Sequence, residues 1–176
     1  HSRHGGVSRY KKFEWLYTEV LGREITGEES ERLGRLFAEY ALDEVRRCPL
    51  IPGIQEVLDA WKGKLPLYVC SGAPHEEVLA VLQERKLDHY FVSIHGSPPA
   101  KAKLLGQIVA PLPLMPQDVL MVGDAPTDRD AAEQVGTLFY GVGPDIKPAS
   151  ESDYPWGTDL TGLNAWIQAR VTGQDS

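Results

Sequence analysis

The amino-acid sequence predicts an α/β fold: a parallel sheet with helices on both faces, joined to a small helical unit. From residue 65 onward, short apolar runs alternate with helix-like segments. Such alternation is typical of parallel strands connected by crossover helices. Before residue 50 the apolar residues recur only at helical spacing, which predicts the separate helical unit. At 176 residues the chain is long enough for one core and an appendage.

The helical unit is predicted to contain a helical hairpin. Apolar and aromatic residues recur at helical spacing over 8–21, and Gly22 supplies a stop. Thr26, followed by Glu29, is a capping signal for a second helix that runs through Val45. Pro and Gly near position 52 mark a hinge. We therefore expect a helical unit over 1–50 and an α/β unit over 51–176.

The α/β unit is predicted to open with a short helix and then alternate strands with helices. The segment 143–158 has no clear periodicity, so we expect it to be a surface excursion. Ligands of such folds bind beyond the carboxyl ends of the strands. The expected strands are 65–70, 90–95, 118–124 and 137–142, and the expected helices are 54–61, 76–85, 100–109, 127–135 and 163–171.

Composition narrows the possible partners. The formal charge of −7, with scattered Lys and Arg, argues against a nucleic-acid surface. No apolar run approaches the length needed to span a bilayer, so no membrane partner is expected. The two cysteines, Cys48 and Cys70, lack metal-binding spacing and are too few for a disulfide framework. A cytoplasmic protein acting on a small molecule is the expected class.

Two carboxylates follow the expected strand 118–124. Asp124 ends this strand and Asp128 falls in the first turn of the next helix, so both can face the ligand edge of the sheet. Oxygen donors of this kind suit Mg²⁺, which takes one or two carboxylates and shares a phosphate with its substrate. An equally good interpretation of these residues alone is that they cap the helix.

Three further residues have the chemistry of a phosphate site. Ser71 and Gly72 follow the strand 65–70 and precede a helix, where a hydroxyl and backbone N–H groups can bind a phosphate oxygen. Lys101 opens the helix 100–109, although a lysine at a helix start is mildly disfavoured by the helix dipole. The alternatives are a capping serine and solvated lysines, and Lys103 is a second candidate for the phosphate lysine. Arg9, Lys11 and Lys12 in the first helix could reach a substrate anion, but we expect them on a solvated basic face.

Together these segments resemble the haloacid dehalogenase superfamily, and within it the phosphoglycolate phosphatase-like enzymes with a helical cap. The resemblance rests on LYVCSG ending in Ser71 and Gly72, GSPPAKAK with Lys101, and GDAPTD with Asp124 and Asp128. It implies a Rossmann-like core and a helical cap over residues 1–50. It also implies a Mg²⁺-dependent phosphatase of a small phosphorylated metabolite, with Asp124 and Asp128 holding the metal. Ser71 would bind the phosphoryl group, and Lys101 would neutralise its charge.

The nucleophile of this superfamily is the first Asp of a DxDGT motif on the first strand, which forms a phosphoaspartate. No DxD occurs before Ser71 in this sequence. The resemblance therefore implies a chain truncated at its N-terminus, with little or no turnover, whose sheet lacks its first strand between the strands ending at Ser71 and Asp124. We expect the two half-sheets to close on each other, or another segment or a second copy to fill the gap.

Other functions remain open from the sequence. A noncatalytic phosphate-binding or interaction module, that is, a pseudophosphatase, would use the same phosphate-binding residues. A haloacid dehalogenase is a weaker alternative because its chemistry does not need the metal carboxylates, and a phosphomutase differs in details of the cap. A nucleotide-binding domain is disfavoured by the absence of glycine-rich phosphate loops.

Overall fold

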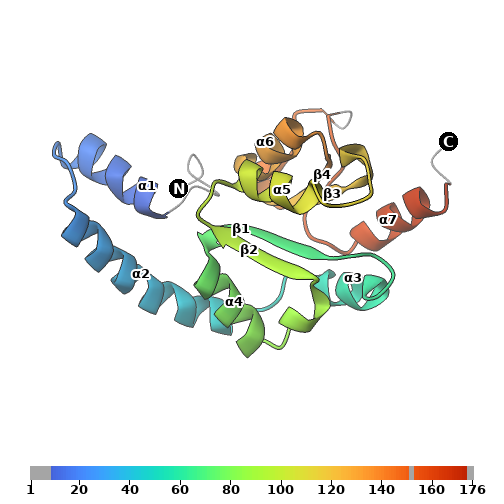
Figure 1. Cartoon of the computed structure of the whole chain (residues 1–176), viewed down its shortest axis with the longest axis horizontal. Coiled ribbons are helices and arrows are strands. Elements are labelled where there is room, and N and C mark those ends of the chain that lie inside the picture. The colour runs from blue at the N-terminus through green and yellow to red at the C-terminus, as the bar shows by residue number, and fades with distance from the viewer. Residues whose placement is uncertain (1–8, 151–152, 174–176) are drawn as a thin grey trace.

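A computed structural model describes residues 9–150 and 153–173 (Figure 1). Two helices, α1 and α2, form an arm on one side of an α/β core, and helices lie on both sides of the core strands (Figure 1). The expected fold class is therefore confirmed. Within the described residues, no helix is both long and apolar enough to cross a bilayer.

The arm contains the expected helical hairpin. Helix α1 (Arg9–Trp15) continues into a π-helical turn (Leu16–Val20), and α2 (Gly27–Arg47) follows. The expected start of the first helix at Ser8 lies outside the described residues. The predicted cap of α2 is present: the Glu29 N–H donates to Thr26 Oγ1 at 3.2 Å, and the Thr26 N–H donates to a Glu29 carboxylate oxygen at 3.1 Å. These bonds satisfy two of the amide groups left free at a helix start.

The core begins with α3 (Ile54–Trp61), which matches the prediction residue for residue. A first sheet follows, in which β1 (Tyr68–Pro74) and β2 (Ser93–Ser97) pair in parallel. Helix α4 (His75–Glu84) connects the two strands along the chain. Strand β1 starts three residues later than expected. The apolar residues Leu65 and Leu67 instead pack against the cluster around Trp61, which accounts for the apolar run without strand pairing.

The second sheet has three strands in the order β3–β4–β5, all parallel. Helix α5 (Lys101–Val109) precedes it, and α6 (Pro126–Val135) connects β3 (Leu120–Gly123) to β4 (Leu138–Val142). Its third strand, β5 (Trp156–Gly157), is followed by the last helix, α7 (Leu163–Val171).

The expectation of a surface excursion over 143–158 is wrong for its described residues. Ile146 is buried in the core, and Tyr154 and Trp156 pack against the same cluster. The Tyr154 hydroxyl donates to the Ile146 carbonyl at 2.6 Å. Aromatic side chains spaced without helical or strand period gave no signal of burial, but their large apolar area drives them into the core.

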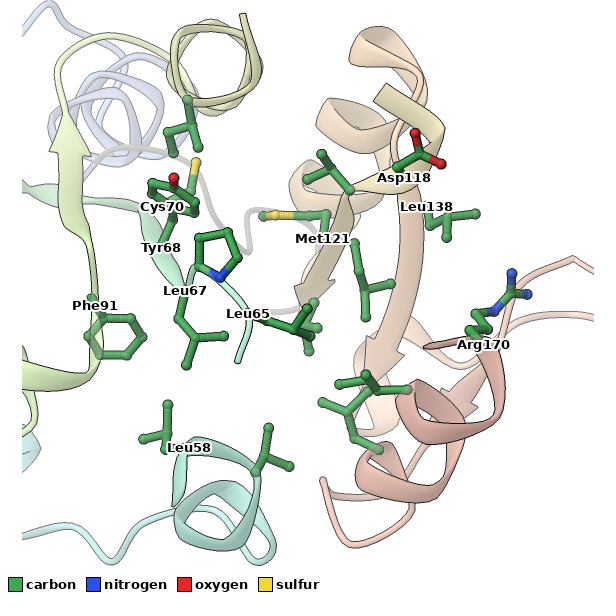
Figure 2. A pocket seen from close by; sticks show the side chains of 18 of the residues that line it. Leu58, Leu65, Leu67, Tyr68, Cys70, Phe91, Asp118, Met121, Leu138 and Arg170 are labelled. Atoms are coloured by element: carbon green, nitrogen blue, oxygen red, sulfur yellow. The ribbon is translucent and has the colours of Figure 1, made fainter. Parts of the chain in front are cut away.

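The two sheets do not join. Strand β1 pairs only with β2, and β3 pairs only with β4, so each has one edge with no partner strand among the described residues. The expectation that the half-sheets close directly on each other is therefore wrong. Apolar side chains from both sides, among them Cys70 and Met121, line the space between the two strand edges (Figure 2).

We call the space between these edges the central groove. It has a volume of about 420 Å³ and is bounded by β1, β3 and helices α3, α5 and α7. In Figure 2, β1 lies to the left of the groove and β3 to the right, with α3 below and α5 above. Residues from the two strand segments line it on facing sides: Leu67, Tyr68 and Cys70 on one, and Leu120, Met121 and Val122 on the other.

Candidate active site

The carboxyl ends of the two half-sheets meet at one ion pair. Lys101 opens α5 shortly after the end of β2, and Asp128 lies in the first turn of α6 after β3. The Lys101 Nζ donates to Asp128 Oδ1, with the two side chains 10% and 3% exposed. A charge pair this well buried is held away from solvent. Lys101 and Asp128 therefore lie together at the carboxyl edge of the strands.

Asp128 is fixed by its backbone surroundings as well. Its second carboxylate oxygen accepts the Ala125 N–H at 3.0 Å, and its own N–H donates to the Ala125 carbonyl at 2.9 Å. This is the helix-capping role that the sequence left open. Both carboxylate oxygens therefore already have partners, and a metal ligand role for Asp128 would have to share one of them.

Gly123 makes room for this arrangement. A Cβ atom built at Gly123 would lie 2.3 Å from Asp128 Cβ and 2.4 Å from its carboxyl carbon. Only glycine lets the end of β3 approach the Asp128 side chain this closely. Gly123 begins the GDAPTD segment, but its contact with Asp128 depends on how α6 returns over the strand, which no local pattern reports.

Ser71 lies within β1, beyond the last residue pairs that are in regular register with β2. Its Oγ accepts the Ala73 N–H at 3.1 Å. Because the oxygen is the acceptor in that bond, the hydroxyl proton remains free to donate to a phosphate oxygen. Gly72 follows in the same half-buried strand end. Both residues lie at the end of β1, on the segment that leads into α4.

Asp124 differs from Asp128 in its surroundings. It is exposed directly after β3, and it forms none of the ion pairs or side-chain hydrogen bonds found between described residues. The described residues contain no cluster of three His, Cys, Asp or Glu side chains suited to a metal. One available carboxylate nevertheless fits Mg²⁺, which often binds one or two carboxylates and completes its shell with water and phosphate.

The two candidate lysines, Lys101 and Lys103, differ in their surroundings. The Lys101 side chain is only 10% exposed and is paired with Asp128, whereas Lys103 is exposed on the same helix. The Lys101 carbonyl also accepts the Cys70 thiol at 3.7 Å, which places the start of α5 beside β1. This contact links the lysine to the strand that carries Ser71.

Cys70 is not a chemical participant at neutral pH. Burial raises the pKa of its thiol to about 11, an effect opposed by nearby Lys101 and reinforced by Asp128. The reactive form of cysteine is the thiolate, so the neutral Cys70 thiol behaves as a small apolar side chain of the groove wall.

The structure adds one contact that the sequence did not predict. Arg9 of α1 makes a two-pronged ion pair with Glu77 of α4, with side chains 10% and 22% exposed, and its guanidinium lies 4.8 Å from the Phe37 ring centroid. Arg9 is therefore not on a solvated basic face. Its partner is 68 residues away in sequence, and no local pattern reports such a pairing.

Comparisons with known proteins agree with this arrangement. A family model described as haloacid dehalogenase-like hydrolase matches residues 2–136. Phosphoglycolate phosphatase of Synechococcus elongatus is 31% identical over 96 residues, which are 53% of this chain and 45% of that protein. The match thus spans less than half the length of that relative.

Solved structures share the fold. A predicted phosphoglycolate phosphatase from Haemophilus somnus superposes with a TM-score of 0.75 and 22% identity, over 95% of this chain and 80% of that one. β-Phosphoglucomutase from Clostridium difficile superposes with a TM-score of 0.77 and 17% identity, over 98% of this chain and 81% of that one. Since the family model spans most of the sequence, the chain belongs to the haloacid dehalogenase-like hydrolases.

Proposed function

We propose that this chain carries the cap, the phosphate site and the metal carboxylate of a Mg²⁺-dependent phosphatase acting on a small phosphorylated metabolite. The observation that supports this most directly is the buried Lys101–Asp128 pair, which holds an ammonium group at the carboxyl edge shared by both half-sheets. A fixed cation at that edge is what a dianionic phosphoryl group needs as it is transferred. The family and the similar phosphatases named above point to the same reaction.

The proposed roles follow from the contacts. The Ser71 hydroxyl donates to one phosphoryl oxygen while its oxygen stays bound to the Ala73 N–H. Lys101, oriented by Asp128, neutralises charge on the transferring group. The backbone N–H of Gly72 is a further donor at the same strand end. Preorganised donors of this kind lower the barrier because they need no rearrangement during the reaction.

Asp124 is the proposed metal ligand, because its carboxylate is exposed at the end of β3 and is free of ion pairs with described residues. When bound, Mg²⁺ would neutralise the phosphate oxygens. Asp128 would support the site mainly through Lys101.

The attacking group in this proposal is an aspartate carboxylate from a strand seated in the central groove. Its oxygen attacks phosphorus, the bond from phosphorus to the leaving oxygen breaks, and water then hydrolyses the acyl phosphate. No DxD motif precedes Ser71 in the sequence, so this strand is not among residues 1–70.

Phosphate binding and hydrolysis test the proposal separately. Inorganic phosphate with Mg²⁺ should bind the 176-residue chain in calorimetry, and Lys101→Met should weaken binding at least tenfold. Lys103→Met is the matched control and should leave binding unchanged, because Lys103 is exposed on the same helix. Hydrolysis of p-nitrophenyl phosphate should require a version extended upstream with a DxDGT strand.

A noncatalytic phosphate-binding module is the second candidate. It is favoured by the fact that Ser71 and Lys101 supply a hydroxyl and a cation to the site, while residues 1–70 contain no DxD motif. Phosphate binding that depends on Lys101, with no hydrolysis in the extended version, would establish this alternative. Equal binding by Lys101→Met and the parent chain would reject both functions.

A further inference from the structure

A second cavity lies at the amino ends of β1 and β2, and we call it the amino-end pocket. Its volume is about 430 Å³, within the range of about 300–1,000 Å³ typical of small-ligand sites. Two segments line it: residues 62–67, which lead into β1, and residues 89–92, which lead into β2. Ser71 lies four residues beyond Leu67, or about 13 Å along a strand. The amino-end pocket is therefore separate from the candidate active site.

One wall of the amino-end pocket is apolar. Leu65, Pro66, Leu67 and Phe91 line both this pocket and the central groove, so they separate the two cavities. Figure 2 shows three of them, Leu65, Leu67 and Phe91, from the groove side. Val92 extends the wall and is 66% exposed. Apolar surface that is open to solvent inside a cavity favours a ligand with an apolar body.

Two exposed lysines, Lys62 and Lys64, line the same pocket. The Lys62 Nζ lies 5.0 Å from the centroid of the Tyr90 ring, a cation–π contact that holds the ammonium group in place. Neither lysine takes part in the ion pairs formed between described residues. Exposed lysines are ordinarily solvated, but these two stand beside an apolar wall. The combination favours a ligand that carries a negative charge as well as an apolar body.

A polar network outside the pocket fixes the Tyr90 ring. The Tyr90 hydroxyl donates to Asp59 Oδ1. Gln55 Nε2 donates to the Tyr90 oxygen at 2.8 Å and to Asp59 Oδ2 at 3.1 Å. Neither Gln55 nor Asp59 lines the pocket. The ring that positions the Lys62 ammonium is therefore preorganised, which reduces the entropy lost when a ligand binds.

The same network sets the charge that the ligand should have. Hydrogen bonds from Tyr90 and Gln55 lower the pKa of Asp59, so its carboxylate is charged at neutral pH. Two ammonium groups and this one carboxylate, with His89 neutral, leave a net positive charge of about one. A monoanion such as a carboxylate matches this balance.

Aromatic side chains select the shape of the apolar body. Phe91, Tyr90 and His89 all line the pocket, and the His89 and Tyr90 ring centroids are 4.1 Å apart. Aromatic pairs are more favourable than their buried area alone implies. A flat ring suits this surface better than a branched aliphatic chain.

We propose that the amino-end pocket binds a small aromatic carboxylate, with its ring on the apolar wall and its carboxylate between Lys62 and Lys64. The pocket lies at the opposite end of β1 from Ser71, so this ligand is distinct from the phosphorylated substrate. The proposal stands independently of the phosphatase function.

The probe is naphthoate, and its binding is followed by amide NMR of the 176-residue chain. Saturable shifts should concentrate in residues 62–67 and 89–92, with one naphthoate per chain. The corresponding neutral alcohol, naphthalenemethanol, should bind at least tenfold more weakly. Equal binding of the two compounds would overturn the proposal, because it would show apolar capture without charge recognition. Absence of saturable naphthoate binding would overturn it as well.

Lysine variants test the anion contact. Lys64→Gln should weaken naphthoate binding at least threefold. Lys86→Gln is the matched control, because Lys86 is equally exposed but does not line the pocket. Equal affinities of the two variants would overturn the assignment of the carboxylate to the lysines. The amide spectrum of each variant checks that it is folded.

Asp59→Asn tests the same contact through a gain of affinity. Asparagine keeps an oxygen that can accept the Tyr90 hydroxyl but removes the negative charge near the lysines. Naphthoate should then bind at least twofold more tightly, whereas naphthalenemethanol should bind as before. Damage to the fold would weaken both compounds. An unchanged naphthoate affinity would contradict the charge balance on which the choice of a monoanion rests.

Two further outcomes decide where naphthoate binds. Shifts centred on Met121 and Val122 would place it in the central groove and overturn the proposal. Lys101→Met should bind naphthoate as tightly as the parent chain, even though its phosphate binding is expected to fall. Loss of naphthoate binding in Lys101→Met would overturn the amino-end pocket as a separate site. Retained naphthoate binding without any phosphate binding by the parent chain would uphold the pocket and reject the proposed function.

Discussion

Gly123 and Asp128 approach so closely that no side chain fits between them: a Cβ atom at Gly123 would lie 2.3 Å from Asp128 Cβ. Gly123→Ala should therefore push Asp128 away from Lys101 and from the Ala125 N–H. We expect it to destabilise the fold by about 1–3 kcal/mol, as overpacking generally does, and to weaken phosphate binding. Urea denaturation and calorimetry measure the two effects.

Gly106→Ala is the control for this prediction. Gly106 lies within α5, and a Cβ atom there would meet no other atom within 4 Å. Alanine in a helix interior is favoured over glycine by about 0.5–1 kcal/mol, so this variant should be slightly more stable than the parent. If Gly123→Ala also proved neutral or stabilising, the close contact with Asp128 would be contradicted.

Replacing one partner of the Lys101–Asp128 pair should lower the free energy of unfolding more than replacing both. Lys101→Met leaves a buried carboxylate without its cation, and a loss of about 3 kcal/mol in the free energy of unfolding is expected. Replacing both residues, as Lys101→Met with Asp128→Leu, should recover much of that loss. A double-mutant cycle by urea denaturation measures the coupling. A double variant as unstable as the sum of the single variants would show that the pair is not coupled.

The Arg9–Glu77 pair should hold the helical arm against the core. It joins α1 to α4 and is more buried than the Arg46–Glu84 pair, which joins α2 to α4 with side chains 41% and 47% exposed. Glu77→Gln should raise amide exchange in α1 severalfold, while Glu84→Gln should have a smaller effect because exposed pairs contribute little. Hydrogen-exchange mass spectrometry makes this comparison. Equal exchange in α1 for both variants would show that Arg9–Glu77 is not the principal contact.

Alkylation should distinguish the two cysteines by their reactivity. The pKa of Cys70 is raised from its ordinary 9.0 to about 11, whereas Cys48 is exposed. At pH 8 about one Cys70 thiol in a thousand is ionised, so iodoacetamide should modify Cys48 first. Peptide mapping by mass spectrometry identifies the modified residue. Rapid modification of Cys70 at pH 8 in the folded chain would contradict the raised pKa.

The raised pKa of Cys70 also makes the free energy of unfolding depend on pH above pH 9. The folded state holds the Cys70 proton more tightly than the unfolded state, so this contribution is complete below pH 9 and is lost as the pH rises towards 11. A Cys70→Ala variant should lose that part of the pH dependence. Denaturant midpoints measured between pH 8 and 11 test it.

The sequence predicted elements whose signal is local. Helix α3 and the cap of α2 by Thr26 and Glu29 follow from spacing and capping chemistry, which act within one or two turns. Ser71 and Lys101 were identified as candidate residues because each stands where a strand gives way to a helix. The family resemblance located the interruption of the sheet between β1 and β3, but the expectation that the half-sheets close on each other was wrong.

Features that depend on distant segments were not predictable in this way. The burial of Ile146, the choice of Glu77 by Arg9 and the fit of Gly123 against Asp128 arise only when separate elements pack. The different surroundings of Asp124 and Asp128 also depend on this packing. Both are carboxylates near one helix start, and only the path of α5 determines which of them contacts the lysine.

The interrupted sheet also affects how the molecule unfolds. Among the residues that the structure describes, no backbone ladder runs between the two half-sheets. Cohesion across the gap therefore passes through side chains, including those of α5, which packs on both β1 and α6. Within each half-sheet the paired strands are close together in the chain, β1 with β2 and β3 with β4, which favours their rapid formation. We therefore expect two cooperative units, visible as separate opening energies in native-state exchange, and a seated strand would merge them into one.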